Sequence, residues 1–417
     1  MPTQLTQEQV EQFGDILEEL GTNLDITKTQ YDAAVRSYEA VGAHLSKPDS
    51  ALAPYKPEIA PQGSFMLGTM VKPVGTNDEL DLDLVCQLTG KAAHWTQKHL
   101  KDAVGDQLRA SDRYRSMIKS PEGRRCWTLE YAEESKYHMD ILPSVVNSGY
   151  RTLLEKAFTA SATTDVASLA MRITDRERAD YRTETNHLNW LRSNPFGYAH
   201  WFFERASIDL EKGDILAEAV RPVRKYNEKK LPLQRVVQIL KRHRDLHSSG
   251  DEHGDKNRPI SIIITTLAAR AYGKETNILL ALQNVITGMR QHIKEKFVPA
   301  LNRNIKWIAN PVDDTENFAD RWVKEPEKEK RFYAWLDAVE ADVARFVGTR
   351  SLGVPAIMES LKKPFGKAEV EKAQNSYGVL LEARRKAGLL RMAEKTATLG
   401  SVGRAAVPDH KFHGAEE

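Results

Sequence analysis

Two aspartates, Asp81 and Asp83, stand inside an apolar segment where a strand is expected to bury itself, in the sequence DELDLDL at 78–84. Residues two apart in a strand share a face, so the two carboxylates project together while the leucines between them occupy the opposite face. Two unneutralised carboxylates on a half-buried face repel each other and lose solvation. A bound divalent cation offsets both penalties, and the pattern therefore predicts a metal site.

A third acid of the same kind is Asp140, which interrupts the apolar strand YHMDILPSV. Hard cations such as Mg²⁺ prefer oxygen ligands and keep room for substrate phosphates. Three carboxylates on two neighbouring strands can hold two metal ions about 3.5–4 Å apart, which clamp the attacking and leaving oxygens of an in-line phosphoryl displacement. We therefore interpret Asp81, Asp83 and Asp140 as catalytic residues and as the ligands of two Mg²⁺ ions, for which Mn²⁺ can substitute.

A triphosphate also needs a binding element, and the upstream sequence PQGSFMLGT contains Gly63 and Ser64. A glycine lets the backbone approach a phosphate closely, and a serine at a helix start offers donors at the positive end of the helix dipole. Each motif alone has an ordinary explanation: a lone Asp-x-Asp is more often an exposed acidic edge, Gly-Ser is usually a turn, and Asp140 can be a hydrogen-bonded core acid. The three together, in this order, favour nucleotide chemistry.

The elements that must position these residues are indicated by periodicity. Apolar residues recur at helical spacing over 7–45 and predict two helices that meet at a capped break near Asp25 and Thr27. Strand patterns predict a sheet that is at least partly antiparallel, in which AEES forms a hairpin loop. The predicted strands lie at 79–88, 125–131 and 137–146.

Helical periods dominate the chain after Tyr150. The clearest helices are predicted at 231–247, 259–272, 278–295 and 328–347. We therefore expect an α+β protein with a domain boundary near 150–180. Its predicted parts are a catalytic domain with the N-terminal helices at 1–170, a helical nucleotide-binding domain at 171–395 and a flexible tail at 396–417.

The composition is that of a soluble protein of more than one domain, since 417 residues exceed the roughly 250–300 that single cores reach. The net charge of +2 predicts no strong attraction of the whole molecule to nucleic acid or membrane. Two cysteines, Cys86 and Cys126, form no disulfide framework and suit a reducing cytosol. No apolar stretch reaches the ~18–20 residues of a membrane span, and the N-terminus is too acidic for a secretory signal. We expect a cytoplasmic protein.

The ordered set GS…DELDLDLVCQL…HMDILPSV resembles the active-site motifs of the superfamily of DNA polymerase beta and the poly(A) polymerases. The chain most closely resembles the bacterial CD-NTases of CBASS antiphage defence, the DncV-like relatives of cyclic GMP-AMP synthase, from about Tyr55 to Trp322. At Phe196 the chain departs from many relatives, which carry a lysine or similar polar residue. The resemblance continues in RSNPFGYAHWF (192–202), LPLQRVVQILKRHRD (231–245), NRPISIIITTLAARAY (257–272) and NPVDDTENFADRW (310–322).

The resemblance implies a polymerase-beta-like nucleotidyltransferase domain with a mixed sheet, a C-terminal helical domain, and an active site in the cleft between them. It implies a synthase that joins NTPs, ATP with or without another NTP, into a cyclic di- or trinucleotide messenger with release of pyrophosphate. Asp140 would draw the proton from the attacking ribose hydroxyl. In the family a lysine and a serine on the next helix hold the incoming triphosphate, and Lys241 and Ser261 match them. For Lys241 a solvated basic face stays open as the alternative.

Partners are also implied by the resemblance. CBASS accessory proteins of the HORMA/TRIP13-like or E1/E2-like ligation type can act on such a chain, the latter on the tail HKFHGAEE, for which a plain disordered end is the alternative. His243 and His247 have helical i, i+4 spacing but no third ligand, so we expect no zinc and no direct DNA sensing. Two other functions stay open: a non-cyclising nucleotidyltransferase acting on RNA, protein or a small molecule, and a catalytically silent nucleotide-binding or scaffold protein.

Overall fold

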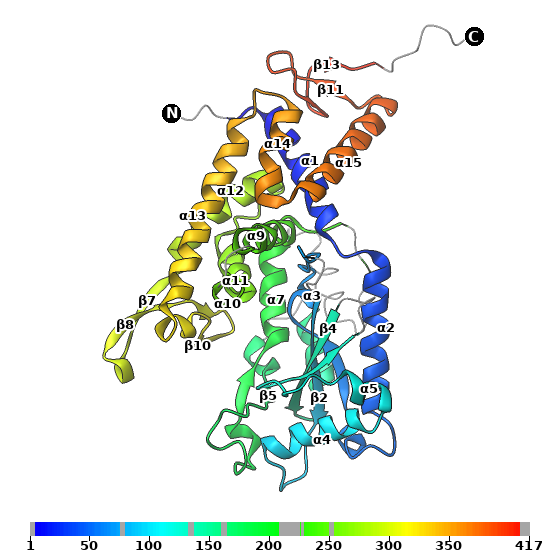
Figure 1. The fold of residues 1–417 in the computed structure, drawn as a ribbon, viewed down its shortest axis with the longest axis vertical. Helices are drawn as coiled ribbons and strands as arrows, with labels where there is room; N and C mark the ends of the chain where they lie inside the picture. The colour runs from blue at the N-terminus through cyan, green and yellow to red at the C-terminus, as the bar shows by residue number, and fades with distance from the viewer. Residues whose placement is uncertain are drawn as a thin grey trace, which may run out of the picture. The chain divides into compact units, whose positions relative to one another are not determined.

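Two compact units make up the chain in the computed structural model (Figure 1). A sheet unit contains Ile26–Lys229 and Asn310–Glu316, and a helical unit contains Met1–Asp25, Lys230–Ala309 and Asn317–Glu417. The residues that the structure describes are 5–75, 80–131, 137–159, 165–207, 226, 229–249 and 254–408.

A mixed sheet forms the centre of the sheet unit, with strand order β1-β2-β4-β5-β6 and β3 paired to β4. Strands β2 and β4 run parallel, whereas β1, β3, β5 and β6 each pair antiparallel with their neighbours. The β3–β4 hairpin was predicted from the sequence and is confirmed, although its AEES turn lies outside the described residues. The strands are β1 (Glu58–Pro61), β2 (Leu80–Thr89), β3 (Trp127–Glu130), β4 (Tyr137–Val146), β5 (Met171–Ile173) and β6 (Leu191–Ser193).

One face of this sheet is covered by helices and forms the core of the unit. Alternate residues of β2 and β4, among them Leu82, Leu84 and Met139, pack in one cluster with apolar side chains of α2 and α4, which lie beside the sheet in Figure 1. The residues between them therefore point to the other face. The helices are α2 (Lys28–Leu45), α3 (Gly63–Leu67), α4 (Gln97–Arg109), α5 (Asp112–Met117), α6 (Tyr150–Ala157) and α7 (Pro195–Ala206), with short 3-10 helices η1 (Ala53–Tyr55), η2 (Val166–Leu169) and η3 (His187–Asn189).

The break predicted between the first two helices is confirmed. Helix α1 ends at Leu24, and Thr27 caps α2 by accepting from the backbone N–H of Gln30, whose side chain in turn accepts from the Thr27 N–H. Such a capping box satisfies two N–H groups that a helix start leaves without partners. The break also coincides with the change of unit, because Asp25 belongs to the helical unit and Ile26 to the sheet unit.

The helical unit is built around α9, which contacts α1, α11, α12, α13 and α14. Its helices are α1 (Gln7–Leu24), α9 (Pro232–Ser248), α10 (Gly254–Asn257), α11 (Ser261–Ala271), α12 (Ile278–Gly288), α13 (Pro326–Gly348), α14 (Val354–Phe365) and α15 (Lys367–Lys386). The helices predicted at 231–247, 259–272 and 328–347 are confirmed as α9, α11 and α13. The helix predicted at 278–295 forms as α12 but ends at Gly288, because η4 follows it and Lys294 already begins β7. Short elements complete the chain: η4 (Met289–His292), η5 (Pro299–Leu301), η6 (Asp320–Val323), and strands β7 (Lys294–Val298), β8 (Arg303–Trp307), β9 (Ala309–Asn310), β10 (Asp313–Asn317), β11 (Arg391–Met392), β12 (Leu399–Gly400) and β13 (Ala405–Ala406).

Basic side chains on α9 are structural. Arg235 is fully buried, and its guanidinium donates to Glu18 Oε1 at 2.9 Å and to Asp25 Oδ2 at 2.7 Å, both on or just after α1. Arg242 donates to Glu369 Oε2 at 2.7 Å. A buried charge is tolerated only when it is paired in this way. The solvated basic face considered from the sequence is therefore wrong for these arginines.

The division into units differs from the boundary expected near residue 170. Strands β5 and β6 and helix α7 lie beyond that point but belong to the sheet unit, because β5 pairs with β4 and extends its sheet. Helix α1 belongs to the helical unit, where it packs on α9, α12 and α15. Phe196, the departure from the family pattern, is a core residue of α7 whose ring lies edge-on to Tyr150.

The flexible tail expected from residue 396 is wrong for residues 399–406, which include two short strands. Strands β12 and β13 both pair with β11, and the backbone N–H of Ser401 donates to Glu11 Oε1 on α1 at 2.9 Å. The HKFHGAEE sequence lies outside the described residues. No helix among those described is long and apolar enough to cross a membrane.

Candidate active site

Four polar side chains occupy the sheet face opposite the core, at the paired ends of β2 and β4. The parallel register places Asp81 beside His138 and Asp83 beside Asp140. The prediction that both aspartates of β2 share a face is confirmed, as is the proximity of Asp140. Parallel pairing in this register brings the three acids together from two separate stretches of sequence.

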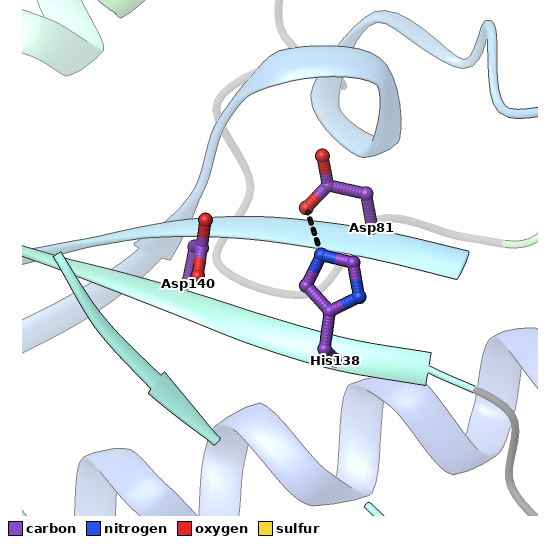
Figure 2. A group of neighbouring side chains, drawn as sticks. All are labelled: Asp81, His138 and Asp140. Carbon is purple, nitrogen blue, oxygen red and sulfur yellow. Dashed lines mark ion pairs between the residues drawn. The ribbon is translucent and has the colours of Figure 1, made fainter. Parts of the chain in front are cut away.

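Asp81, His138 and Asp140 form a compact group in which each residue offers a ligand atom within 4.8 Å of the others. The Nε2 atom of His138 lies 3.2 Å from Asp81 Oδ1, and Figure 2 shows the imidazole pointing from β4 toward this carboxylate. The Asp81 side chain is 58% exposed, so it remains accessible to a ligand. Two carboxylates and an imidazole at this spacing can bind a divalent cation.

Asp83 lies outside this group and packs instead against Gly63 at the start of α3. A Cβ atom built on Gly63 would be 2.3 Å from Asp83 Oδ2, and the Gly63 φ of +58° is in the left-handed region. The backbone N–H of Gln62 also donates to the Asp83 carbonyl at 2.8 Å. The glycine that the sequence linked to phosphate binding therefore has a structural role in seating Asp83.

Ser64 lies in the five-residue helix α3, which contacts β2. It is partly exposed, and its carbonyl accepts from the N–H of Thr69 at 3.0 Å. The structure therefore brings the Gly-Ser pair next to the strand that carries Asp81 and Asp83.

Two further residues at the site, Thr128 and Cys126, were not predicted as functional. Thr128 on β3 is the register partner of Asp140, and its hydroxyl donates to Asp140 Oδ1. Burial, with the nearby charges of Asp140 and Asp83, raises the pKa of the Cys126 thiol to about 12. A sequence signal existed for His138, which stands two residues before Asp140 on the same strand face. Thr128 can be found only from the β3–β4 register.

The predicted triphosphate residues Lys241 and Ser261 belong to the helical unit, whereas the acids, Gly63 and Ser64 belong to the sheet unit. Lys241 is 5% exposed on α9. Ser261 is the first residue of α11, and its hydroxyl accepts from Arg244 Nη1 at 2.9 Å. Burial lowers the pKa of Arg244, and the charge of Asp245 opposes this effect. Arg244 therefore orients the Ser261 hydroxyl.

The histidine pair of α9 takes part in core hydrogen bonds. His243 Nε2 lies 3.0 Å from Asp342 Oδ2, and Trp335 Nε1 donates to His243 Nδ1 at 3.1 Å. Both ring nitrogens of His243 are thus engaged by protein groups.

The sheet unit carries the sequence signature of a known domain. The family described as the cyclic GMP-AMP synthase DncV-like nucleotidyltransferase domain matches residues 57–143, which include all three acids and the Gly-Ser pair. A c-di-GMP synthase of Roseivirga ehrenbergii is 28% identical over 379 residues, which cover 91% of this chain and 90% of that protein. The cyclic dinucleotide synthase CdnG of Bradyrhizobium diazoefficiens is 23% identical and covers 87% of this chain and 82% of its own. The chain therefore contains a DncV-like nucleotidyltransferase domain and is similar to bacterial cyclic dinucleotide synthases over most of its length.

Solved CD-NTases share the fold. The Bradyrhizobium diazoefficiens CdnG structure with GTP has a TM-score of 0.61 at 20% identity and covers 87% of this chain and 97% of that chain. The Escherichia coli CdnC structure with ATP has a TM-score of 0.51 at 16% identity and covers 84% and 96%. These likenesses confirm the predicted polymerase-beta-like α+β fold, and the match to the nucleotidyltransferase domain identifies the chain as a nucleotidyltransferase.

Proposed function

We propose that this chain is a CD-NTase that joins nucleoside triphosphates into a cyclic dinucleotide, or a trinucleotide, which acts as a second messenger in CBASS antiphage defence. The observation that carries the proposal is the in-register placement of Asp81, Asp83 and Asp140 on one sheet face. Two relatives named as cyclic dinucleotide synthases, which match most of this chain, support the same reaction. Each transfer forms a phosphodiester at a ribose hydroxyl and releases pyrophosphate.

The donor set of this face fits a hard divalent cation, because its carboxylates supply the oxygen ligands that Mg²⁺ and Mn²⁺ prefer. Asp81, Asp83 and Asp140 would hold the ions. When bound, a pair of divalent ions neutralises charge on the attacking and leaving oxygens of an in-line displacement. Asp140 is the proposed acceptor of the ribose hydroxyl proton, and the hydrogen bond from Thr128 fixes the orientation of its carboxylate.

Phosphate binding is proposed for Ser64, Lys241 and Ser261. The contact of α3 with β2 supports Ser64, because it places a partly exposed serine beside the acidic strand. The Arg244 hydrogen bond supports Ser261, because it leaves the serine proton available to donate to a phosphate oxygen. Lys241→Ala should raise the KM for the NTP more than it lowers kcat. An unchanged KM would remove Lys241 from the phosphate site.

The nucleobase is a separate question. The family resemblance favoured ATP, whereas the relative from Roseivirga ehrenbergii is named a c-di-GMP synthase and CdnG has been solved with GTP. We therefore propose GTP as a substrate to be tested beside ATP.

Product analysis tests the proposal. The purified chain is incubated with the four NTPs singly and in pairs, with Mg²⁺ or Mn²⁺, and the mixture is treated with phosphatase before separation and mass spectrometry. A phosphatase-resistant cyclic product supports the proposal and identifies its bases. Extension of an added RNA, or modification of a protein or small molecule, without any cyclic product would support the non-cyclising alternative. Unconsumed NTPs under all conditions, including phage-infected extract, would support a silent binding protein.

Accessory proteins of the HORMA/TRIP13-like or E1/E2-like type are proposed as partners of the system. The E1/E2-like proposal depends on the C-terminal segment 410–417. Deleting this segment should abolish phage protection in cells while the purified chain keeps its synthase activity. Undiminished protection would rule out a role for the tail.

A further inference from the structure

A cavity of about 170 Å³ lies in the sheet unit where β4, β5 and β6 meet. This volume is well above the roughly 10–15 Å³ that one water molecule requires. Its apolar wall includes Val145, Val146 and Leu188, and its polar wall includes Arg172, His187 and Arg192. Val145 stands five residues beyond Asp140 on the same strand, which corresponds to roughly 17 Å along β4. The cavity is therefore separate from the acidic site.

The polar wall is dominated by two arginines that face each other across a strand pair. Arg172 on β5 and Arg192 on β6 are direct register partners. Like charges in directly opposite positions destabilise a sheet. Arg172 Nη1 donates to the Trp190 carbonyl at 2.9 Å, which anchors its guanidinium. In the described part of the chain, neither arginine forms an ion pair with a carboxylate.

The surrounding charges increase the positive potential. The pKa of Arg172 is lowered mainly by burial and also by the charge of Arg192. The pKa of His187 is lowered mainly by burial and also by the charges of Lys91 and Arg172. Two acids of this neighbourhood already accept hydrogen bonds from the chain: Glu184 accepts from the Asn186 N–H at 2.7 Å and from Asn189 Nδ2 at 2.8 Å, and Asp165 accepts from the N–H of the cavity residue Ala167 at 3.0 Å. Cations therefore exceed anions around the cavity.

We propose that this cavity binds a small organic phosphate, with Arg172 and Arg192 holding the phosphate group and the apolar wall contacting the organic part. Guanidinium groups match the geometry of a phosphate and form charge-assisted hydrogen bonds with it. An anion bound between the two arginines also offsets their mutual repulsion. This stabilisation is present only when the cavity is occupied. The site is independent of the proposed synthase reaction and can bind a ligand whether or not the acidic site is active.

Histidine NMR on the full-length chain tests the site. The resonance of His187 is assigned by its loss in His187→Gln, and its pKa is followed while inorganic phosphate or phenyl phosphate is added at constant chloride. Binding should raise the His187 pKa, because a nearby anion stabilises the imidazolium. Phenyl phosphate should bind more tightly than inorganic phosphate, because its ring contacts the apolar wall.

Two variants separate the site from general charge effects. Arg192→Gln should raise the phenyl phosphate Kd roughly tenfold or more, as expected for loss of a charge-assisted hydrogen bond. Arg182→Gln is the control. Arg182 is an exposed residue between β5 and β6 that does not line the cavity, so its loss should leave the phenyl phosphate Kd unchanged. Equal weakening in both variants, or a His187 response to sodium chloride alone, would overturn the proposal. Binding of an RNA oligonucleotide without binding of phenyl phosphate would also overturn it.

Discussion

Gly63→Ala tests whether Asp83 depends on a close approach of α3. The added Cβ would lie 2.3 Å from Asp83 Oδ2, whereas side-chain contacts of a Cβ begin at 3.0–3.4 Å, so the carboxylate must move by about 0.7–1.1 Å. A misplacement of about 1 Å in a catalytic group lowers rates by roughly 100-fold. We therefore expect the rate of nucleotidyl transfer to fall by about two orders of magnitude.

The same substitution also strains the backbone, because Gly63 has a φ of +58°. Placing a residue with a Cβ in this region destabilises a fold by about 1–2 kcal/mol. For a unit of this size the strain corresponds to a fall in Tm of roughly 2–8 °C. This loss of stability must be separated from the displacement of Asp83.

Gly90→Ala is the matched control. Gly90 follows β2 and has a φ of +77°, and no atom lies within 4 Å of the position that a Cβ would take, so its alanine variant suffers the strain without the clash. Both variants are compared by pyrophosphate release under saturating NTP and by thermal unfolding. Similar Tm values with a large rate loss only in Gly63→Ala would support the argument. Wild-type turnover in Gly63→Ala would refute the placement of Asp83 in the catalytic machinery.

Three further predictions concern single side chains. Asp81→Asn should abolish product formation while changing the free energy of unfolding by no more than about 0.5 kcal/mol, since it removes charge but little volume from an exposed position; retained turnover would refute the metal assignment. Thr128→Val, which removes the hydroxyl that donates to Asp140, should lower Mn²⁺ affinity or turnover by about 10–100-fold in a titration followed by electron paramagnetic resonance, and unchanged values of both would show that this hydrogen bond has no role. The hydrogen bond from His243 lowers the pKa of Asp342 below 3.8, so this carboxylate stabilises the fold above that pH and the effect is lost as pH falls through the folded-state pKa. Asp342→Asn should therefore lower the Tm at pH 6 and have less effect near pH 3, and a difference that does not depend on pH would contradict the assignment.

The acidic site was largely predictable, because a period-two pattern fixes which face of a strand a residue occupies. Asp81 and Asp83 could be assigned to one face from their spacing alone. Their relation to Asp140 depends on the parallel register of β2 and β4, which alternation does not specify. His138 follows from the same spacing rule but was missed, because Mg²⁺ prefers oxygen ligands and an imidazole does not fit that expectation.

The role of the basic residues on α9 could not be predicted from helical periodicity. A run of cations on one helix is usually solvated, and nothing local to 231–247 reveals that Arg235 meets Glu18 and Asp25. Those partners lie more than two hundred residues earlier in the chain. Burial of such charges is decided by tertiary pairing, which propensity and periodicity do not describe.

The boundary between the two units could not be predicted from local sequence patterns either. The short strands β5 and β6 have three residues each, too few to show alternation, yet their pairing with β4 and with each other keeps residues past 170 in the sheet unit. The two N-terminal helices were predicted correctly as elements, but an amphipathic helix does not indicate which distant surface covers its apolar face.

The position of α1 has a consequence during synthesis of the protein. This helix leaves the ribosome before α9, α12 and α15, against which it packs and which follow about 200 residues later or more. At about 5–20 residues per second, α1 waits at least about 10–40 s for its first native partner. The sheet unit, almost all of whose sequence lies in that interval, can fold while α1 is still unpartnered. Slowing translation past residue 230 should therefore lengthen exposure of the apolar face of α1 to chaperones and proteases, without delaying the sheet unit.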